Sequence, residues 1–291
     1  MDATCLLDGK FDLAESPVWS VAGQTLWFVD INAPALHRLD PATLTLETWK
    51  MPAAIGCIAL MQDGGVIAAR RDGIWRLDLA GGPETLLAPS PLEAARFNDG
   101  RCDRQGRFWV GGMTDTREPE TALYRLDGAS LPGRLTRQGL VGAIATSNAL
   151  AWSPDGATLY HADTPTHCVF AYDYDAKTAA ISNRRLFLDL RDSGERPDGA
   201  AVDSAGNYWV ALYGAGRVVQ FSPVGERLRD VHLPVKAPTM PCFGGPDLKT
   251  LYITTARQKH DADELAKMPL AGGIFSVRVD IPGLPETPFA G

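Results

Sequence analysis

The sequence lacks the paired cysteines and histidines that build disulfide frameworks and zinc sites. Its five cysteines are odd in number and scattered, and none forms a C-x-x-C pair. This usage is typical of a reduced, cytoplasmic protein whose cysteines are core residues. The five histidines include no H-x-x-x-H or H-E-x-x-H pair, which leaves oxygen ligation as the expected metal chemistry.

Positive charge and long apolar runs are also missing. The net charge of -7 argues against a nucleic acid or an anionic membrane as partner. No stretch approaches the roughly 18 to 20 apolar residues of a membrane span, and the N-terminus has no basic leader segment. No G-x-S-x-G elbow, P-loop or G-x-G-x-x-G follows a predicted strand, so neither a covalent serine mechanism nor a nucleotide cofactor is indicated.

What the chain does contain is a strand, tight turn and strand that recur six times. In the clearest copy, residues 147–160, Pro154, Asp155 and Gly156 form the turn between two apolar strands. The other turns fall near residues 20–23, 62–65, 103–106, 203–206 and 245–248. A period of roughly 40 to 50 residues is typical of a β-propeller. No linker divides the chain, so we expect an all-β, six-bladed β-propeller forming a single domain over residues 1–291.

The two ends of the chain are expected to meet. Thr4–Leu7 is a short apolar run without a partner in its own repeat, and residues 272–279 read as a strand. Because a propeller must close its ring, we predict that the N-terminal strand completes the last blade. The chain shows no long helix, and residues 261–268 are the best candidate for a short one.

One position of the repeat, four residues before the template Trp, should form a ring around the propeller axis. Four of its six occupants carry side-chain oxygen: the ring is Glu15, Gly56, Asn98, Asn148, Asp198 and Met240. Converging carboxylates and amides predict a site for a hard cation. The alternative is that polar residues at strand starts only make turns.

Two segments break the repeat, and a further ring lies fifteen residues after the first. Residues 90–98 are expected to form a loop that delivers Arg96 and Asn98 to the channel, and residues 114–121 form a charged insertion or simply a solvated loop. The further ring is Asp30, Arg71, Met113, Asp163, Tyr213 and Thr255. Its two acids either orient the site or touch substrate, or they are strand-end acids in water.

Several motifs, in order along the whole chain, resemble the SMP-30/gluconolactonase family. They are E-S-P-V-W at 15–19, F-V-D-I at 28–31, R-F-N-D-G at 96–100, S-N-R-R at 182–185, P-D-G at 197–199, C-F-G-G at 242–245 and A-G-G-I-F at 271–275. The resemblance implies a six-bladed propeller that hydrolyses sugar lactones with one divalent metal in its channel. The ion would be Ca²⁺, Zn²⁺, Mn²⁺, Mg²⁺ or Fe²⁺.

Carried over residue by residue, the resemblance implies Glu15, Asn148 and Asp198 as metal ligands. It places Arg96 and Asn98 on the substrate. An acidic substrate contact is expected in the 114–121 loop, where we take Glu118 over Asp115 and Glu120. Ala149 stands where the family has Gly after the Asn, a departure that concerns the local backbone.

The expected reaction is hydrolysis of an aldonolactone to the aldonic acid, such as a glucono-, xylono-, arabino- or galactonolactone. Asp198 is the candidate general base for the attacking water, and Arg96 and Asn98 position the sugar. The alternatives are a phosphotriesterase-like or aryl-ester hydrolase on the same ligands, and a calcium-binding propeller without activity. The expected partner is the small-molecule lactone, and the expected state is a monomer or weak dimer.

Overall fold

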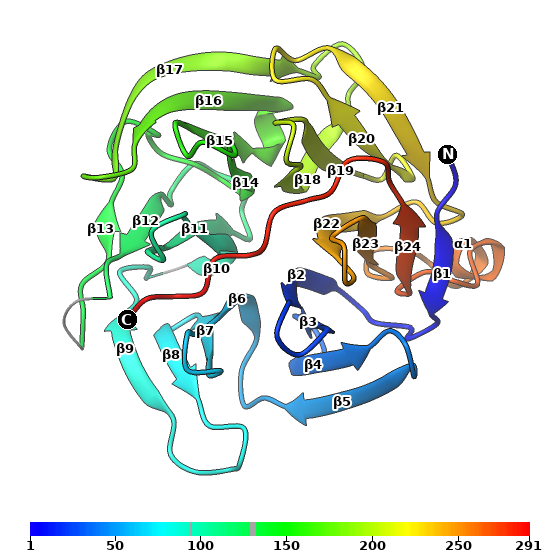
Figure 1. Cartoon of the computed structure of the whole chain (residues 1–291), viewed down its shortest axis with the longest axis horizontal. Helices are drawn as coiled ribbons and strands as arrows, with labels where there is room; N and C mark the ends of the chain where they lie inside the picture. The colour runs from blue at the N-terminus through cyan, green and yellow to red at the C-terminus, as the bar shows by residue number, and fades with distance from the viewer. Residues whose placement is uncertain (94, 129–131) are drawn as a thin grey trace.

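The described residues form six four-stranded antiparallel sheets arranged around one axis (Figure 1). This computed structural model describes residues 1–93, 95–128 and 132–291. Each sheet is one blade, and its first strand lies nearest the axis. The predicted six-bladed, all-β propeller is therefore confirmed.

The blades follow one another along the chain. Blade one is β2 (Ala14–Ser20), β3 (Thr25–Asp30), β4 (Ala35–Asp40) and β5 (Thr45–Lys50). Blade two is β6 (Ile55–Leu60), β7 (Val66–Arg70), β8 (Gly73–Leu77) and β9 (Thr85–Pro89). Blade three is β10 (Ala95–Cys102), β11 (Phe108–Thr114), β12 (Leu123–Leu126) and β13 (Thr136–Arg137).

Blades four to six repeat the pattern. Blade four is β14 (Ser147–Trp152), β15 (Thr158–Asp163), β16 (Cys168–Asp175) and β17 (Ala180–Asp189), with a 3₁₀ turn η1 (Thr164–Thr166). Blade five is β18 (Arg196–Val202), β19 (Tyr208–Tyr213), β20 (Arg217–Phe221) and β21 (Arg227–His232). Blade six is β22 (Pro238–Gly244), β23 (Thr250–Thr255), β24 (Ile274–Arg278) and β1 (Thr4–Leu7).

The N-terminal strand closes the ring as predicted. β1 pairs antiparallel with β24, with Thr4 opposite Ser276 and Cys5 opposite Phe275. The chain just before β1 also bonds blade five, because the Ala3 amide donates to the carbonyl of His232 at 2.9 Å. The short helix is confirmed as α1 (Ala262–Lys267), capped by Asp261. Among the described residues, no helix is long and apolar enough to cross a membrane.

Deleting residues 1–9 is expected to lower the melting temperature by roughly 5 to 15 °C. The deletion exposes the edge of β24 and uncovers apolar surface of blade six, at a cost of several kcal/mol. Differential scanning calorimetry of the truncated chain gives the result. An unchanged midpoint would show that β1 contributes nothing to closure.

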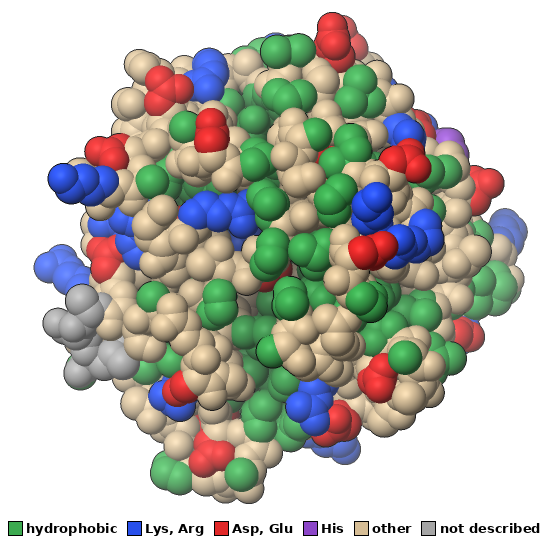
Figure 2. All heavy atoms as spheres, in the orientation of Figure 1, with side chains coloured by type: hydrophobic (Ala, Val, Ile, Leu, Met, Phe, Trp, Pro, Cys, Tyr) green, Lys and Arg blue, Asp and Glu red, His purple; other side chains and the backbone are tan. Residues whose placement is uncertain are grey.

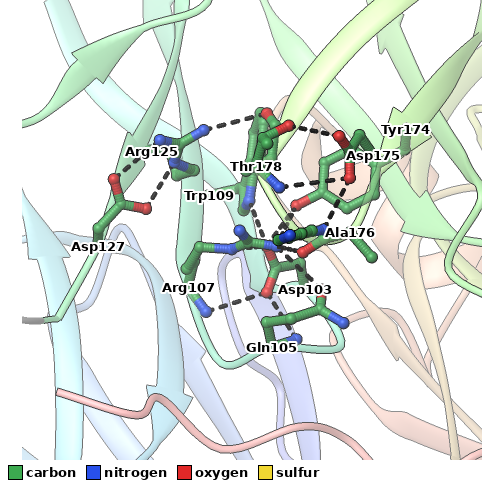
Figure 3. A network of polar contacts seen from close by, with 12 residues as sticks. Asp103, Gln105, Arg107, Trp109, Arg125, Asp127, Tyr174, Asp175, Ala176 and Thr178 are labelled. Atoms are coloured by element: carbon green, nitrogen blue, oxygen red, sulfur yellow. Dashed lines mark hydrogen bonds and ion pairs between the residues drawn. The ribbon is translucent and has the colours of Figure 1, made fainter.

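Buried aspartates hold the hairpin turns that join the first two strands of blades three and five. Asp103 accepts from the amides of Gln105 and Arg107, from Arg107 Nε at 2.6 Å, and from Trp109 Nε1 at 3.1 Å. Tyr174 of blade four donates to the same carboxylate (Figure 3). Asp203 occupies the equivalent place in blade five and accepts from Trp209 Nε1. The turn aspartates of these two blades, Asp103 and Asp203, are thus centres of hydrogen bonding, which we call the polar hubs. The hub at Asp103 also joins blade three to blade four.

The C-terminal segment, residues 279–291, crosses the face that carries these hairpin turns (Figure 1). Its backbone bonds Ser204, Leu248, Leu60 and Gly106, which lie in or beside the turns of four blades. Figure 2 shows the same face, where hydrophobic side chains gather on both sides of the segment. A cavity of about 450 Å³ lies beside it, with Trp19, Trp27 and Pro285 in its walls. The segment therefore closes one end of the axis.

Candidate active site

The predicted ring of residues lies on the six inner strands, and the regular pairing of every inner strand is interrupted there. The irregularities fall at Glu15/Val18, Ile55/Cys57, Phe97/Gly100, Asn148/Ala151, Pro197/Ala200 and Pro238/Met240. A β-bulge re-aims a side chain, and here it occurs once per blade at the channel. The alternative that the four polar residues only make turns is wrong, because they lie within strands, as do the other two residues of the ring.

The backbone just after two ring residues is left-handed. Ser16 has φ 50° and Ala149 has φ 59°. An L-residue there costs about 1 kcal/mol or more relative to Gly. This conformation explains why Gly is the usual residue after the Asn, and Ala149 departs from the resemblance at that cost. The strand keeps its course in spite of the Cβ, and Asn148 remains on the ring.

Five predicted site residues line one cavity of about 350 Å³ at the end of the axis opposite the C-terminal segment. They are Glu15, Arg96, Asn98, Asn148 and Asp198. The expectation that a loop over residues 90–98 delivers Arg96 and Asn98 is wrong, because both lie on strand β10, which begins at Ala95. The inner strands of blades one, three, four and five thus hold the polar groups on rigid backbone.

A chain of hydrogen bonds fixes the two amides. Arg96 Nη1 donates to Asn98 Oδ1 at 2.9 Å, and Asn98 Nδ2 donates to Asn148 Oδ1 at 3.0 Å. Asn148 Nδ2 then donates to Thr164 Oγ1 at 2.8 Å. The oxygen of Asn98 therefore faces a guanidinium, a poor place for a metal ligand. The oxygen of Asn148 keeps a free lone pair beside the carboxylates.

The two ring carboxylates are crowded and poorly compensated. Burial raises the pKa of Glu15 to about 8, with the Asp99 carboxylate adding to the effect. Burial, then Glu15 and Asp99, raise the pKa of Asp198 well above its usual range. Within the described part of the chain, Glu15 accepts only from the Ser16 amide, and no hydrogen bond reaches the Asp198 carboxylate. A bound cation would relieve this crowding.

The donor set fits a hard divalent cation. In residues 1–93, 95–128 and 132–291, no three His, Cys, Asp or Glu side chains are placed to hold a metal. The available donors are two carboxylates and an amide oxygen, which are ligands for ions such as Ca²⁺ or Mg²⁺, with water completing the shell. Thiolate or imidazole ligation has no support here.

Beneath the ring, Asp99 adds negative charge. It is buried, and its Oδ2 accepts from the Leu150 amide at 3.0 Å. The cation below it, Arg101, faces Glu286 of the C-terminal segment at 3.6 Å. Arg101 also attracts Asp99 and so opposes the burial that raises the pKa of that carboxyl. Because Arg101 is shared between Asp99 and Glu286, it offsets the charge beneath the ring only in part.

The acids of the further ring act on the backbone. Asp30 accepts from the amides of Asp12 and Leu13, and Asp163 accepts from those of Ala145 and Thr146. Each carboxylate fixes the segment that leads into an inner strand. Among the predicted roles, orientation of the site therefore fits these two acids better than contact with substrate or simple exposure to water at a strand end. Met113 and Tyr213 of this ring line the cavity.

Glu118 lies away from the cavity that holds the other predicted residues. Its side chain is exposed, and its carbonyl accepts from Thr114 Oγ1. Its neighbour Arg117 lines the cavity instead. Asp115 of the same loop lies close enough to Arg96 to oppose the lowering of its pKa by burial. The role of Glu118 stays a prediction.

Sequence reasoning missed several cavity residues: Arg117, His167, Arg196, Gln258 and Lys259. One of them carried a signal. Arg196 precedes Asp198 by two residues, as Arg96 precedes Asn98, so the repeat itself marks both arginines. The others come from connections between strands, which the repeat does not constrain.

The chain is similar to proteins of one family over its whole length. A family model described as the SMP-30/Gluconolactonase/LRE-like region matches residues 13–257. A 6-deoxy-6-sulfogluconolactonase of Pseudomonas putida is 44% identical over 99% of this chain and 98% of that protein. Human regucalcin is 35% identical over 99% of this chain and 98% of its own.

A solved structure agrees with these matches. The calcium-binding protein regucalcin from Agrobacterium tumefaciens superposes with a TM-score of 0.93 at 27% identity. The match covers 100% of this chain and 98% of that one. With its six blades, its ring of oxygen donors and these matches, the chain belongs to the SMP-30/gluconolactonase family.

Proposed function

We propose that this protein is a lactonase that hydrolyses a sugar lactone to the aldonic acid, with one divalent cation held by Glu15, Asn148 and Asp198. The observation that carries the proposal is the convergence of two crowded, buried carboxylates, two amides and Arg96 on one cavity. The similarity to a protein named 6-deoxy-6-sulfogluconolactonase supports the choice of substrate. The similarity to a structure described as calcium-binding supports the cation.

The residues of the chain divide the work. When bound, a divalent cation supplies Lewis-acid polarisation of the lactone carbonyl. Asp198 accepts a proton from the attacking water, whose oxygen bonds to the carbonyl carbon. As the ring C–O bond breaks, Asp198 returns that proton to the departing ring oxygen, which completes the hydroxy acid. Arg96 and Asn98 hold the sugar hydroxyls and fix the carbonyl carbon in reach of the water.

A substrate panel tests the proposal. The protein, loaded in turn with Ca²⁺, Zn²⁺, Mn²⁺ and Mg²⁺, is assayed on γ- and δ-aldonolactones, paraoxon and phenyl acetate. We expect turnover of lactones well above the two other substrates. Preference for paraoxon or phenyl acetate would indicate the ester-hydrolase alternative. Metal binding without turnover of any substrate would indicate a calcium-binding propeller.

Two variants are expected to distinguish residues that bind the substrate from residues that bind the metal. Arg96→Ala should keep the metal and raise KM roughly ten- to a hundred-fold, because a hydrogen bond from a charged group is worth about 1.5 to 3 kcal/mol. Asn98→Ala should behave likewise, since its oxygen faces Arg96. Steady-state kinetics and elemental analysis give both quantities. An Asn98→Ala protein that purifies without metal would make Asn98 a ligand.

A further inference from the structure

The wall of the candidate cavity carries four cations that form no direct ion pair within the described residues. They are Arg96, Arg117, Arg196 and Lys259. In the part of the chain that the structure describes, no carboxylate oxygen lies within 4.0 Å of a nitrogen of any of these four charged groups. By contrast, Arg217 and Arg227 share Glu195, and Arg278 pairs with Asp247. The chain as a whole is acidic, with a net charge of -7. The positive wall is therefore a local feature of this cavity.

Three of these cations converge from different blades. Arg117 comes from the connection after β11, Arg196 from the start of β18, and Lys259 from the connection after β23. Arg196 lies over the ring of Tyr213 at 5.3 Å, which holds the guanidinium at the cavity wall. This arrangement gathers like charges, which repel one another unless an anion lies between them.

The backbone is strained at two of these positions. Arg117 has φ 61° and Lys259 has φ 63°. Left-handed backbone costs a residue with a Cβ about 1 to 2 kcal/mol, and such strain clusters at ligand-binding positions. Burial, then Arg117, Arg196 and Arg96, lower the pKa of Lys259, which is consistent with crowding of positive charge. Residues of exposed turns such as Gln24 and Leu44 are left-handed as well, so the strain alone does not mark a site. The gathering of four cations in the wall of one cavity is the observation that indicates an anionic ligand.

The carboxylates and the exposed cations lie at different depths of the cavity, so they would contact different ends of a bound lactone. The carboxylates that are proposed to hold the cation mark the place of the carbonyl, and Arg96 is already bonded to Asn98 beside them. Arg117 and Lys259 are exposed and belong to the mouth of the cavity. They are therefore available to the part of the substrate that lies farthest from the carbonyl.

We propose that the substrate is a sugar lactone with an anionic substituent at the end away from its carbonyl, bound by Arg117, Arg196 and Lys259. This inference rests on the proposed function and narrows its substrate class. A sulfonate, a phosphate ester and a carboxylate share the required chemistry, because each offers several oxygens to arginine and lysine donors. Asp198 attracts Arg196 and Lys259 at longer range, but it is a proposed ligand of the cation. Once the cation is bound, a neutral aldonolactone would leave the positive wall without an opposing charge.

The test compares lactones that differ in this substituent. The metal-loaded protein is assayed on D-glucono-1,5-lactone and on its 6-phospho, 6-deoxy-6-sulfo and 6-carboxylate counterparts. We expect kcat/KM for at least one anionic lactone to exceed that of the neutral one by about tenfold or more, since charge-assisted hydrogen bonds are worth about 1.5 to 3 kcal/mol. The preference should decline as salt is added. The best anionic substrate identifies the substituent.

Two variants locate the effect. Arg117→Gln and Lys259→Gln should each lower the anionic-to-neutral ratio of kcat/KM roughly five- to tenfold. Lys177→Gln is the matched control, because Lys177 is an exposed lysine in the outer turn of blade four. It should leave the ratio at the wild-type value. Calorimetric binding of 6-phosphogluconate against gluconate gives a second readout that does not depend on turnover.

The failures of the two proposals differ. Suppose that the neutral lactone is hydrolysed and the anionic-to-neutral ratio of kcat/KM is near one, or that both Gln variants leave this ratio unchanged. Either result contradicts the anionic substrate, while the proposal of a lactonase stands. Failure to hydrolyse any of the four lactones overturns the proposed function, and the inference falls with it.

Discussion

Replacing Asp198 with Asn is expected to release the divalent cation and to reduce lactone hydrolysis by about 10³-fold or more. The substitution removes a ligand and the proposed proton acceptor from a buried position, where only 7% of the residue's surface is exposed. Glu15→Gln and Asn148→Ala should lose the metal as well, because each supplies one of the few oxygen donors. Elemental analysis and initial rates of the purified variants give both results.

The metal-free fold should tolerate the Asp198→Asn change. The raised pKa of Asp198 means that the folded chain holds a proton which the unfolded chain releases. Without metal, stability therefore falls as pH rises above the ordinary pKa of a carboxyl group. Asn removes this penalty, so the metal-free variant should melt at or above the wild-type temperature near pH 8. Asp155→Asn, in an exposed turn, is the control that should keep metal and activity.

Metal retained at full occupancy by all three ligand variants would remove the proposed cation site. Loss of metal from the Asp155→Asn control would show that the losses come from general destabilisation.

Asp103→Asn is expected to destabilise the protein by about 3 to 5 kcal/mol, the cost of breaking a buried ion pair from one side. The carboxylate is fully buried. Its Oδ1 faces two backbone amides, which an Asn oxygen can still serve. Its Oδ2 accepts from Arg107 Nε and Trp109 Nε1, where an Asn amide would place donor against donor (Figure 3). The shift of the urea midpoint measures the loss.

Asp203→Asn provides the matched comparison. Asp203 is equally buried, but its side-chain partners are Trp209 Nε1 and the amides of Asn207 and Gln220. Those two amides can turn and present oxygen to the new Asn, so the loss should be smaller, about 1 to 3 kcal/mol. Equal urea midpoints for the two variants and the wild type would contradict the role of these hubs.

The repeat carried most of what the sequence could predict. Turn residues such as Pro154 and Gly156 fix where strands reverse, so the six inner hairpins and the ring could be aligned by counting. The unpaired run at Thr4–Leu7 predicted closure, because an exposed edge is costly. The two strands nearest the axis are almost fully buried, and burial makes their apolar pattern strong.

The rest depends on contacts that the repeat does not encode. Outer strands such as β17 are mostly exposed and show no clear alternation, which is why the fourth strands of blades one to five were not predicted. Residues 90–98 were expected to form a loop because the segment breaks the repeat, although pairing with β11 makes 95–102 a strand. Arg117 and Lys259 reach the cavity through left-handed residues in connections, which have no periodic signal.

One measurement tests the central claim most directly: lactonase rate followed against the divalent metal bound, in protein stripped by chelator and then titrated with metal. We predict negligible turnover in the stripped protein and a linear rise that ends at one ion per chain. The titration of the Asp198→Asn variant should stay flat. Full turnover in protein shown to contain no metal, or a rise that persists in the variant, would contradict a cation held by Glu15, Asn148 and Asp198.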